Sequence, residues 1–303
     1  MSAPLKILVA GRTGQLARAL VRCAEEDDNL DLIASGRPEL DITDPLSCRW
    51  AIDGVRPDIV INPAAFTNVD AATTNPDMAE AVNAKGAGYL AAAAAAKGIP
   101  IIHISTDYVF DGTKPDAYVE DDRVNPINTY GKTKLAGESA IGSLSPHHLI
   151  LRTAWVYSIY EPNFVASVLK KASGPHPMAM VTDQIGNPTS AADLAGALLQ
   201  IARKMTSGDW ERLSGVYHLA GPEPMTRHAW AHAILSASRA LSGPDCDVQE
   251  AVTADFPTPA RRPLQTSLDS GRCSTLFDVT LPPADLSLRA TVGSLLKTKE
   301  TLA

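Results

Sequence analysis

The stretch that decides the fold reads Leu5-Lys-Ile-Leu-Val-Ala-Gly11-Arg-Thr-Gly14-Gln-Leu-Ala17. Its first six residues form a mostly apolar run that ends at a glycine, which is typical of a buried strand. From residue 16 to residue 26, apolar residues recur at the spacing of one helix face, at Leu16, Ala19, Leu20 and Cys23. The sequence therefore predicts a strand, a glycine turn and a helix, in that order.

The glycine turn has the composition of a dinucleotide-binding turn. Gly11 suits the tight turn, Gly14 leaves the backbone bare for a pyrophosphate, and Ala17 is small enough for the helix to pack closely on the strand. The amides at the helix N-terminus would then hold the phosphates. An ordinary glycine turn is the alternative for so short a motif, but its position directly after the first strand favours nucleotide binding.

Further apolar runs continue the alternation of strands and helices. The sequence predicts strands at Leu30–Ala34, Asp58–Asn62, Ile99–Ser105 and Leu149–Thr153, and helices at Met78–Lys97 and Asn128–Ile141. Strands that are apolar throughout and alternate with helices indicate an α/β fold, a Rossmann-type doubly wound parallel sheet covered on both faces. A ligand is then expected outside the carboxyl ends of the strands.

Proline-containing turns become frequent beyond residue 153, as in Gly174-Pro-His-Pro177 and Gly221-Pro-Glu-Pro224. We therefore predict a smaller carboxyl-terminal substrate domain. The expected division is residues 1–153 for the dinucleotide-binding domain and residues 154–303 for a mainly substrate-binding domain, with some of its segments returning to the first domain.

Composition excludes several classes of protein. The chain has 303 residues, 45% of them apolar, and 27 Lys plus Arg against 34 Asp plus Glu give a net charge of −7. No long basic run is present, so nucleic-acid binding is not expected. The start of the chain carries no stretch of signal-peptide or membrane-span length, which predicts a cytoplasmic protein without membrane partners. The four cysteines form no C-x-x-C pair, and we expect no metal site.

The residues after the second predicted strand bear on the choice of cofactor. Ser35-Gly36-Arg37 stands where an NAD-selective protein tends to carry an acidic residue for the ribose hydroxyl. An arginine there can pair with a 2′-phosphate instead, which favours NADPH over NADH. A solvated surface cation is the alternative for Arg37, and use of NADH stays open.

Tyr130 and Lys134 are the first candidates for chemistry. Residues four apart share one face of a helix, so the phenol and the ammonium can act together. A nearby ammonium stabilises the phenolate and is expected to lower the phenol pKa toward neutrality. The phenol can then act as a general acid toward a carbonyl oxygen, while Lys134 reaches the ribose of a nicotinamide cofactor. A half-buried Tyr beside a Lys that extends to solvent is the alternative.

Thr106 lies at the carboxyl end of the fourth predicted strand, within Ser105-Thr-Asp-Tyr-Val-Phe-Asp-Gly112. Open parallel sheets present their active sites at this edge. Its hydroxyl can donate a hydrogen bond to a substrate oxygen as negative charge develops there. The alternative is a local cap for the turn that follows.

Longer blocks carry a resemblance to a known family. The chain resembles the dTDP-4-dehydrorhamnose reductases, which are extended short-chain dehydrogenase/reductases. The likeness covers nearly the whole chain, through the first glycine turn and the blocks Leu40–Asp44, Ser105–Gly112, Asn128–Glu138, Leu151–Tyr157, Asp183–Thr189, Tyr217–Gly221 and Ala260–Pro263.

The resemblance implies NADPH-dependent reduction of the C4 ketone of dTDP-4-dehydro-β-L-rhamnose to dTDP-β-L-rhamnose. Carried over by position, the catalytic residues are Thr106, Tyr130 and Lys134. The implied cofactor-binding residues are Gly11, Thr13, Gly14, Gln15, Leu16, Arg37, Asp41, Ile42, Ala64 and Ala65, together with Tyr130 and Lys134. The implied substrate-binding residues are Thr106, Asp107, Tyr108, Trp155, Asn163, Arg261 and Arg262.

Two of these assignments have a physical basis of their own. The flat apolar face of Trp155 suits the CH-rich side of a deoxyhexose, with a core Trp as the alternative. Arg261 or Arg262 suits the diphosphate, because a guanidinium fork fits phosphate oxygens. The partner is then a dTDP-linked 4-keto-6-deoxy sugar, and the chain is expected to be a monomer or a homodimer. Another nucleotide-sugar reductase or epimerase, or a non-catalytic NADP-binding regulatory subunit, are the competing functions.

Overall fold

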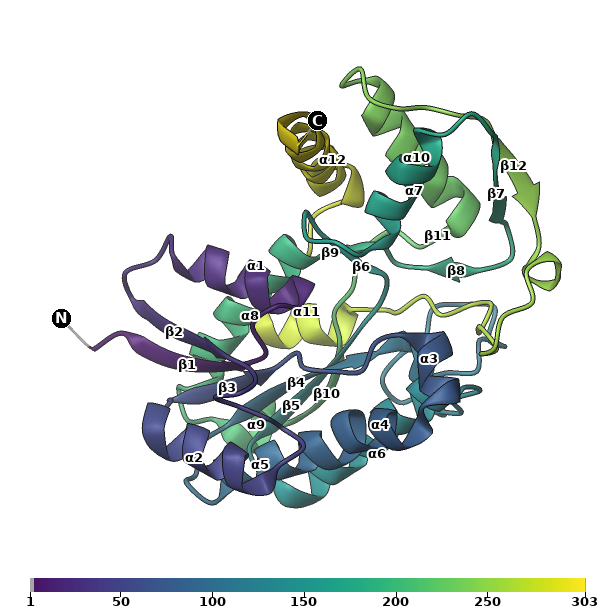
Figure 1. Ribbon diagram of the computed structural model, residues 1–303. Coiled ribbons are helices and arrows are strands. Elements are labelled where there is room, and N and C mark those ends of the chain that lie inside the picture. Colours follow the sequence, from purple (N-terminus) through teal and green to yellow (C-terminus); the bar gives the residue numbers. More distant parts are fainter. Residues whose placement is uncertain (1–2, 303) are drawn as a thin grey trace.

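Six parallel strands form the central sheet of the computed structural model, which describes residues 3–302 (Figure 1). Five of them are the predicted ones, and the structure confirms these predictions within two residues at each end. Their order across the sheet is β2-β1-β3-β4-β5-β10. The strands are β1 (Leu5–Ala10), β2 (Leu30–Ser35), β3 (Ile59–Asn62), β4 (Ile101–Thr106), β5 (His148–Thr153) and β10 (Gly215–His218).

The strand order reverses at β1, which pairs with β2 on one side and β3 on the other. This reversal opens a crevice at the carboxyl ends of the strands, where doubly wound sheets bind ligands. The predicted fold class is therefore confirmed. The sixth strand, β10, was not predicted, because its four residues, Gly-Val-Tyr-His, do not form an apolar run.

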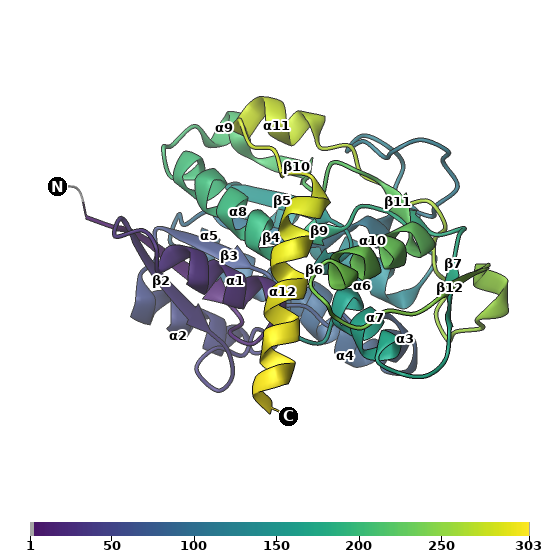
Figure 2. The same ribbon diagram turned by 90° about the horizontal axis from the view of Figure 1, so that it is seen from above.

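Side chains alternate between the two faces of the sheet, as the period of a strand requires. Ile7 and Val9 of β1 pack into one cluster, and Leu8 and Ala10 into another. Helices cover both faces, as Figures 1 and 2 show. The first cluster includes α1 (Gln15–Ala24), α8 (Ala191–Met205) and α11 (Gly271–Phe277), and the second includes α2 (Pro45–Val55), α5 (Ala87–Ala95) and part of α6 (Thr129–Leu144).

The predicted helix Met78–Lys97 consists of three joined segments. They are α4 (Pro76–Glu80), a π-helical turn η1 (Ala81–Gly86) and α5. Single π-helical turns inside helices are frequent at functional sites. Here the turn places buried Asn83, whose amide binds both backbone groups of Phe66 in the loop after β3 and the hydroxyl of Thr133 on α6.

A second core lies to one side of the sheet and is built from residues after 153 (Figure 2). It contains α7 (Phe164–Ala172), α10 (Arg227–Arg239), α12 (Ala284–Leu302) and β7 (Met178–Val181), which pairs with β12 (Val248–Ala251). The remaining elements are β6 (Val156–Tyr157), β8 (Ile185–Gly186), β9 (Thr189–Ser190), β11 (Met225–Thr226), α3 (Val69–Thr74), α9 (Trp210–Leu213) and the 3₁₀ turns η2 (Asp107–Val109) and η3 (Thr253–Asp255).

Segments after residue 153 thus contribute to both cores. α8, β10 and α11 pack on the sheet, whereas α7, α10 and α12 form the second core. None of the helices that the structure describes is long and apolar enough to cross a membrane.

Candidate active site

The first glycine turn has the geometry that the sequence predicts. Gly11 has a φ of 108°, which a residue with a side chain rarely adopts, and its amide donates to the Ser35 carbonyl at 2.6 Å. Gly14 is the N-cap of α1 and, like Thr13, is exposed. A Cβ at Gly14 would meet nothing within 4 Å. The amides at the start of α1 are therefore open to an anion, and the turn fits a dinucleotide pyrophosphate.

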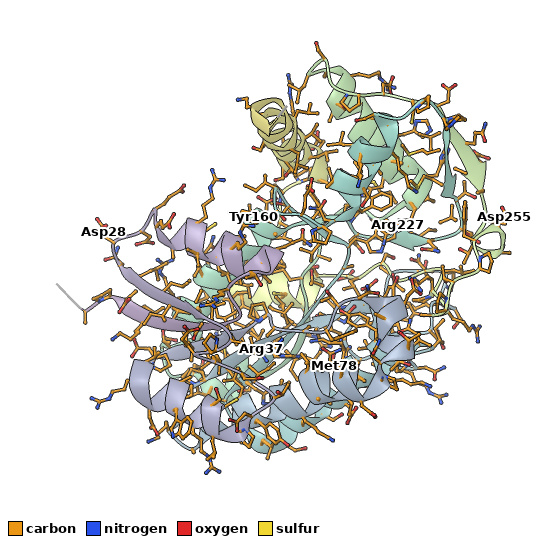
Figure 3. All side chains as sticks on the ribbon, viewed as in Figure 1. Asp28, Arg37, Met78, Tyr160, Arg227 and Asp255 are labelled. Atoms are coloured by element: carbon orange, nitrogen blue, oxygen red, sulfur yellow. The ribbon has the colours of Figure 1, made fainter. Side chains whose placement is uncertain are left out.

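The neighbouring loops carry the other predicted cofactor residues. A Cβ at Gly11 would lie 3.9 Å from Cβ of Ala64, which places the loop after β3 beside the turn. Asp41 accepts hydrogen bonds from both the amide and the hydroxyl of Thr43, which lower the pKa of its carboxyl group. Arg37, labelled in Figure 3, is exposed just after β2.

Arg12 links the glycine turn to the loop that carries Arg37. Its guanidinium donates to the Arg37 carbonyl at 2.6 Å and pairs with Glu39 at 3.0 Å. The side chain of Arg37 itself is in none of the salt bridges found among the described residues. Two arginines therefore lie close together, on the glycine turn and just after β2, and the guanidinium of Arg12 is paired with a carboxylate.

Thr106 ends β4 and begins the 3₁₀ turn η2. Its hydroxyl donates to Asp107 at 2.9 Å and accepts from the Tyr108 amide at 3.2 Å. Thr106 therefore caps the turn η2, which is the alternative role that the sequence suggested for it. Burial raises the pKa of the Asp107 carboxyl to about 6, although hydrogen bonds with Thr266 and Thr106 oppose the shift.

Tyr130 stands in the first turn of α6, directly across from η2. Its ring meets that of Tyr108 edge to face, with 5.9 Å between centroids. The close approach depends on Gly131, because a Cβ there would lie 2.1 Å from the Tyr108 carbonyl oxygen. Asn128 fixes the start of the helix by accepting from the Gly131 amide at 2.9 Å.

The pKa of Tyr130 is raised, and the expectation of a lowered phenol pKa is wrong for the chain as the structure describes it. Burial is the main cause, and the interaction with the Thr106 side chain opposes it. The phenol is consequently protonated at neutral pH, which is the state that a proton donor requires.

Lys134 is buried, with 1% of its surface exposed, and it does not extend to solvent. Its Nζ donates to the Ile104 carbonyl at 2.6 Å and lies 3.0 Å from Nε2 of His103. Burial lowers the pKa of Lys134 to about 8, and the charge of Glu138 opposes this shift. The amine is therefore held against strand β4, one helical turn from Tyr130.

Two further residues of this group, His103 and Asn62, were not predicted. The Asn62 amide lies 3.1 Å from Nδ1 of His103, and its oxygen accepts from the Ala64 amide at 3.2 Å. Burial and the charge of Lys134 lower the pKa of His103, so the imidazole is neutral. Polar residues in the apolar strands β3 and β4 were the signal that could have identified both.

A buried ion pair between Glu138 and Arg152 lies next to the catalytic group. Glu138 accepts from Ser105 and from two nitrogens of Arg152, at 3.0 Å for Nε and 2.7 Å for Nη2. Both charged side chains are 5% exposed. Through Glu138, these contacts connect α6 to the carboxyl ends of β4 and β5, next to Thr106.

Trp155 borders the site on the side of the second core. It has a φ of 45°, a left-handed conformation that bulky residues seldom adopt. The guanidinium of Arg227 lies over the indole, 3.4 Å from the ring centroid. Gly186 packs against the indole as well, since a Cβ there would lie 2.5 Å from two of its atoms. Arg227 belongs to none of the motifs that predicted the site.

The other predicted substrate residues have local partners. Asn163 caps α7, accepting from the Ala166 amide at 3.1 Å and donating to the carbonyls of Ser158 and Tyr160. Arg262 forms a two-pronged pair with Asp70, at 2.8 and 2.7 Å. Arg261 is exposed, and its carbonyl accepts from Asn128 at 2.9 Å.

The sheet, the glycine turn and the group of Thr106, Tyr130 and Lys134 define an extended short-chain dehydrogenase/reductase. Comparison with known proteins identifies the family within this class. Residues 5–296 match the family described as "RmlD substrate binding domain". A dTDP-4-dehydrorhamnose reductase from Sinorhizobium fredii is 41% identical over 96% of this chain and 98% of its own length. The chain belongs to the dTDP-4-dehydrorhamnose reductase family.

Solved structures agree with this assignment. A dTDP-4-dehydrorhamnose reductase from Clostridium acetobutylicum matches with a TM-score of 0.88 and 34% identity, covering 96% of this chain and 99% of that one. The enzyme from Bacillus anthracis, in complex with NADP, matches with a TM-score of 0.85 and 28% identity, covering 97% and 99%.

Proposed function

We propose that the protein reduces the C4 ketone of dTDP-4-dehydro-β-L-rhamnose with NADPH, giving dTDP-β-L-rhamnose. The observation that carries the proposal is the placement of Tyr130, at the start of α6, against the turn that follows Thr106 at the carboxyl end of β4, with Lys134 buried one helical turn further along α6. Family membership supports the choice of substrate, because the relatives are named for this reaction.

Tyr130, Thr106 and Lys134 each have a separate role in this reaction. A bound NADPH supplies the hydride that reaches C4. Tyr130 gives its proton to the ketone oxygen, and the raised pKa of the phenol keeps that proton in place until negative charge develops on the oxygen. Thr106 turns its hydroxyl from Asp107 toward the same oxygen. Lys134 holds the ribose hydroxyls from its position against β4.

The glycine turn and the Arg37 loop hold the cofactor in this proposal. The open amides at the start of α1 bind the pyrophosphate, with Thr13, Gln15 and Leu16 beside them. Asp41, Ile42, Ala64 and Ala65 line the adenosine and nicotinamide sides. Arg37 pairs with the 2′-phosphate and favours NADPH, while NADH remains usable because Glu39 offers an acceptor for a ribose hydroxyl.

The substrate lies between the sheet and the second core. We assign the cofactor to residues 1–153 and most of the substrate site to residues 154–303, from which α8, β10 and α11 return to the sheet. Asp107, Tyr108 and Trp155 border the sugar in this assignment. Asn163 contributes by holding the loop before α7, and Arg261 and Arg262 lie toward the nucleotide. We propose a monomer or a homodimer, which the molar mass in solution tests.

NADPH consumption with dTDP-4-dehydro-β-L-rhamnose tests the function. We expect turnover with the formation of dTDP-β-L-rhamnose, and a loss of about 10²- to 10⁴-fold in kcat for Tyr130→Phe with unchanged NADPH binding. Tyr89→Phe on α5 removes the same hydroxyl away from the site and should leave kcat unchanged. Cofactor binding without turnover of this or any other 4-keto nucleotide sugar would indicate the regulatory alternative instead.

A further inference from the structure

Arg227 is the first residue of α10, and it faces the sheet from the second core (Figure 3). Its backbone amide donates to the Gln184 carbonyl at 3.1 Å. Its guanidinium lies over Trp155 and 4.8 Å from the ring centroid of Phe164. Both aromatic rings therefore hold the cation in one place.

The same guanidinium reaches across to the catalytic side. Its charge interacts electrostatically with the side chains of Tyr108 and Asp107. Tyr108 in turn contacts the ring of Tyr130. Only one side chain thus separates Arg227 from the proposed proton donor.

The charge of Arg227 is poorly compensated. None of the salt bridges among the described residues includes it, and Asp107, the nearby carboxyl group, has a raised pKa. Arg262 is close enough to repel it, and the fork of Arg262 is itself occupied by Asp70. A cation in the first turn of a helix also lies at the unfavourable end of the helix dipole. Such a placement is costly unless an anion binds there.

We propose that Arg227 binds the diphosphate of the nucleotide sugar, and this inference rests on the proposed function. In a 4-keto sugar the diphosphate is attached at C1, across the ring from the ketone. With the ketone oxygen at Tyr130, the diphosphate therefore reaches a cation about one sugar ring away. Arg227 lies at the far side of Tyr108, and Trp155 is the platform that orients its fork.

Trp155 was predicted to pack against the sugar, and in this proposal it also positions Arg227. One region of its indole is covered by Arg227 and another packs on Gly186. The left-handed backbone at Trp155 then positions the indole under the guanidinium of Arg227. The sugar contacts the part of the indole that Arg227 and Gly186 do not cover.

Binding of dTDP and dTMP to the full chain, measured by calorimetry at saturating NADPH, tests the proposal. For Arg227→Met, which keeps the apolar stem without the charge, we expect the Kd of dTDP to rise about ten- to a hundred-fold. The Kd of dTMP should rise less, and that of NADPH should not change. Arg239→Met removes an exposed cation of the same helix, paired with Asp245, and should change none of these values.

Equal Kd values of dTDP for Arg227→Met and wild type, or equal losses for dTDP and dTMP, would overturn the proposal. If Arg227→Met does not fold, Arg227→Gln replaces it and the same comparison decides. The readout is independent of turnover. Arg227-dependent dTDP binding without reduction of the sugar would reject the proposed function alone, whereas turnover with Arg227-independent dTDP binding would reject this inference alone.

Discussion

Replacing Glu138 by Gln should destabilise the protein strongly, because this carboxylate is the buried partner of Arg152. Both side chains are 5% exposed, and Arg152 directs two nitrogens at Glu138, which also accepts from Ser105. Gln has the same shape but turns an amide donor toward a guanidinium that can only donate. The variant therefore leaves a buried cation without its counterion.

Breaking a buried ion pair from one side costs about 3–5 kcal/mol. The entropy of unfolding scales with chain length, so for 303 residues this loss corresponds to a decrease in Tm of about 5–8 °C. The exposed pair between Lys97 and Asp53 provides the matched control. Its atoms are 2.6 Å apart, but its side chains are 53% and 54% exposed. Asp53→Asn should therefore cost no more than about 1 kcal/mol.

Thermal unfolding followed by circular dichroism, together with urea titration, measures both variants. The double variant Glu138→Met/Arg152→Met removes the pair without leaving either charge alone, and it should be more stable than Glu138→Gln. A decrease in Tm for Glu138→Gln that is no larger than that for Asp53→Asn would refute the reasoning. So would a double variant less stable than the single one.

Three other perturbations have defined outcomes. Gly186→Ala places a Cβ 2.5 Å from the Trp155 indole, so the KM for the sugar should rise about tenfold with NADPH affinity unchanged, whereas Gly196→Ala, in open space on α8, should have no such effect. The pKa of Lys134 is lowered to about 8 from its usual 10.5, so the unfolded chain binds more protons between these values and stability rises with pH. Relative to Lys134→Met, the wild type should gain about 3 kcal/mol in the free energy of unfolding from pH 8 to 10.5, and a constant difference in urea titrations would contradict this. Arg37→Ala should raise the KM for NADPH about tenfold and leave that for NADH unchanged, which steady-state rates with both cofactors measure.

The sheet could be predicted because its strands carry their information locally. β1 and β4 are mostly apolar, β1 leads directly into the glycine turn, and β4 ends in the hydroxyl residues Ser105 and Thr106. β10 could not be predicted this way, since Gly215–His218 becomes a strand only by pairing with β5. The π-helical turn at Ala81–Gly86 also escapes local patterns, because it lies inside one continuous helical stretch, and the spacing of residues predicts a helix without showing its hydrogen-bond register.

The site residues also differ in whether local sequence could identify them. Tyr130 and Lys134 follow from helical spacing, and Thr106 from its place at a strand end. Arg227 belongs to no motif, and its importance arises only when α10 brings it over Trp155, seventy-two positions earlier in the chain. The pKa values could not be predicted from helical spacing, because spacing shows that Lys134 is near Tyr130 but not that both side chains are buried.

Hydrogen-bond directions around Lys134 act in the same sense as its burial. The Ala64 amide donates to the Asn62 oxygen, so the nitrogen of that side chain faces His103 and donates to Nδ1. A neutral imidazole that accepts at Nδ1 carries its proton on Nε2, which points at Lys134. Only an uncharged amine can accept that proton's hydrogen bond. The chain of contacts from Ala64 thus favours the same form of Lys134 as burial does, and Glu138 is the charge that opposes both.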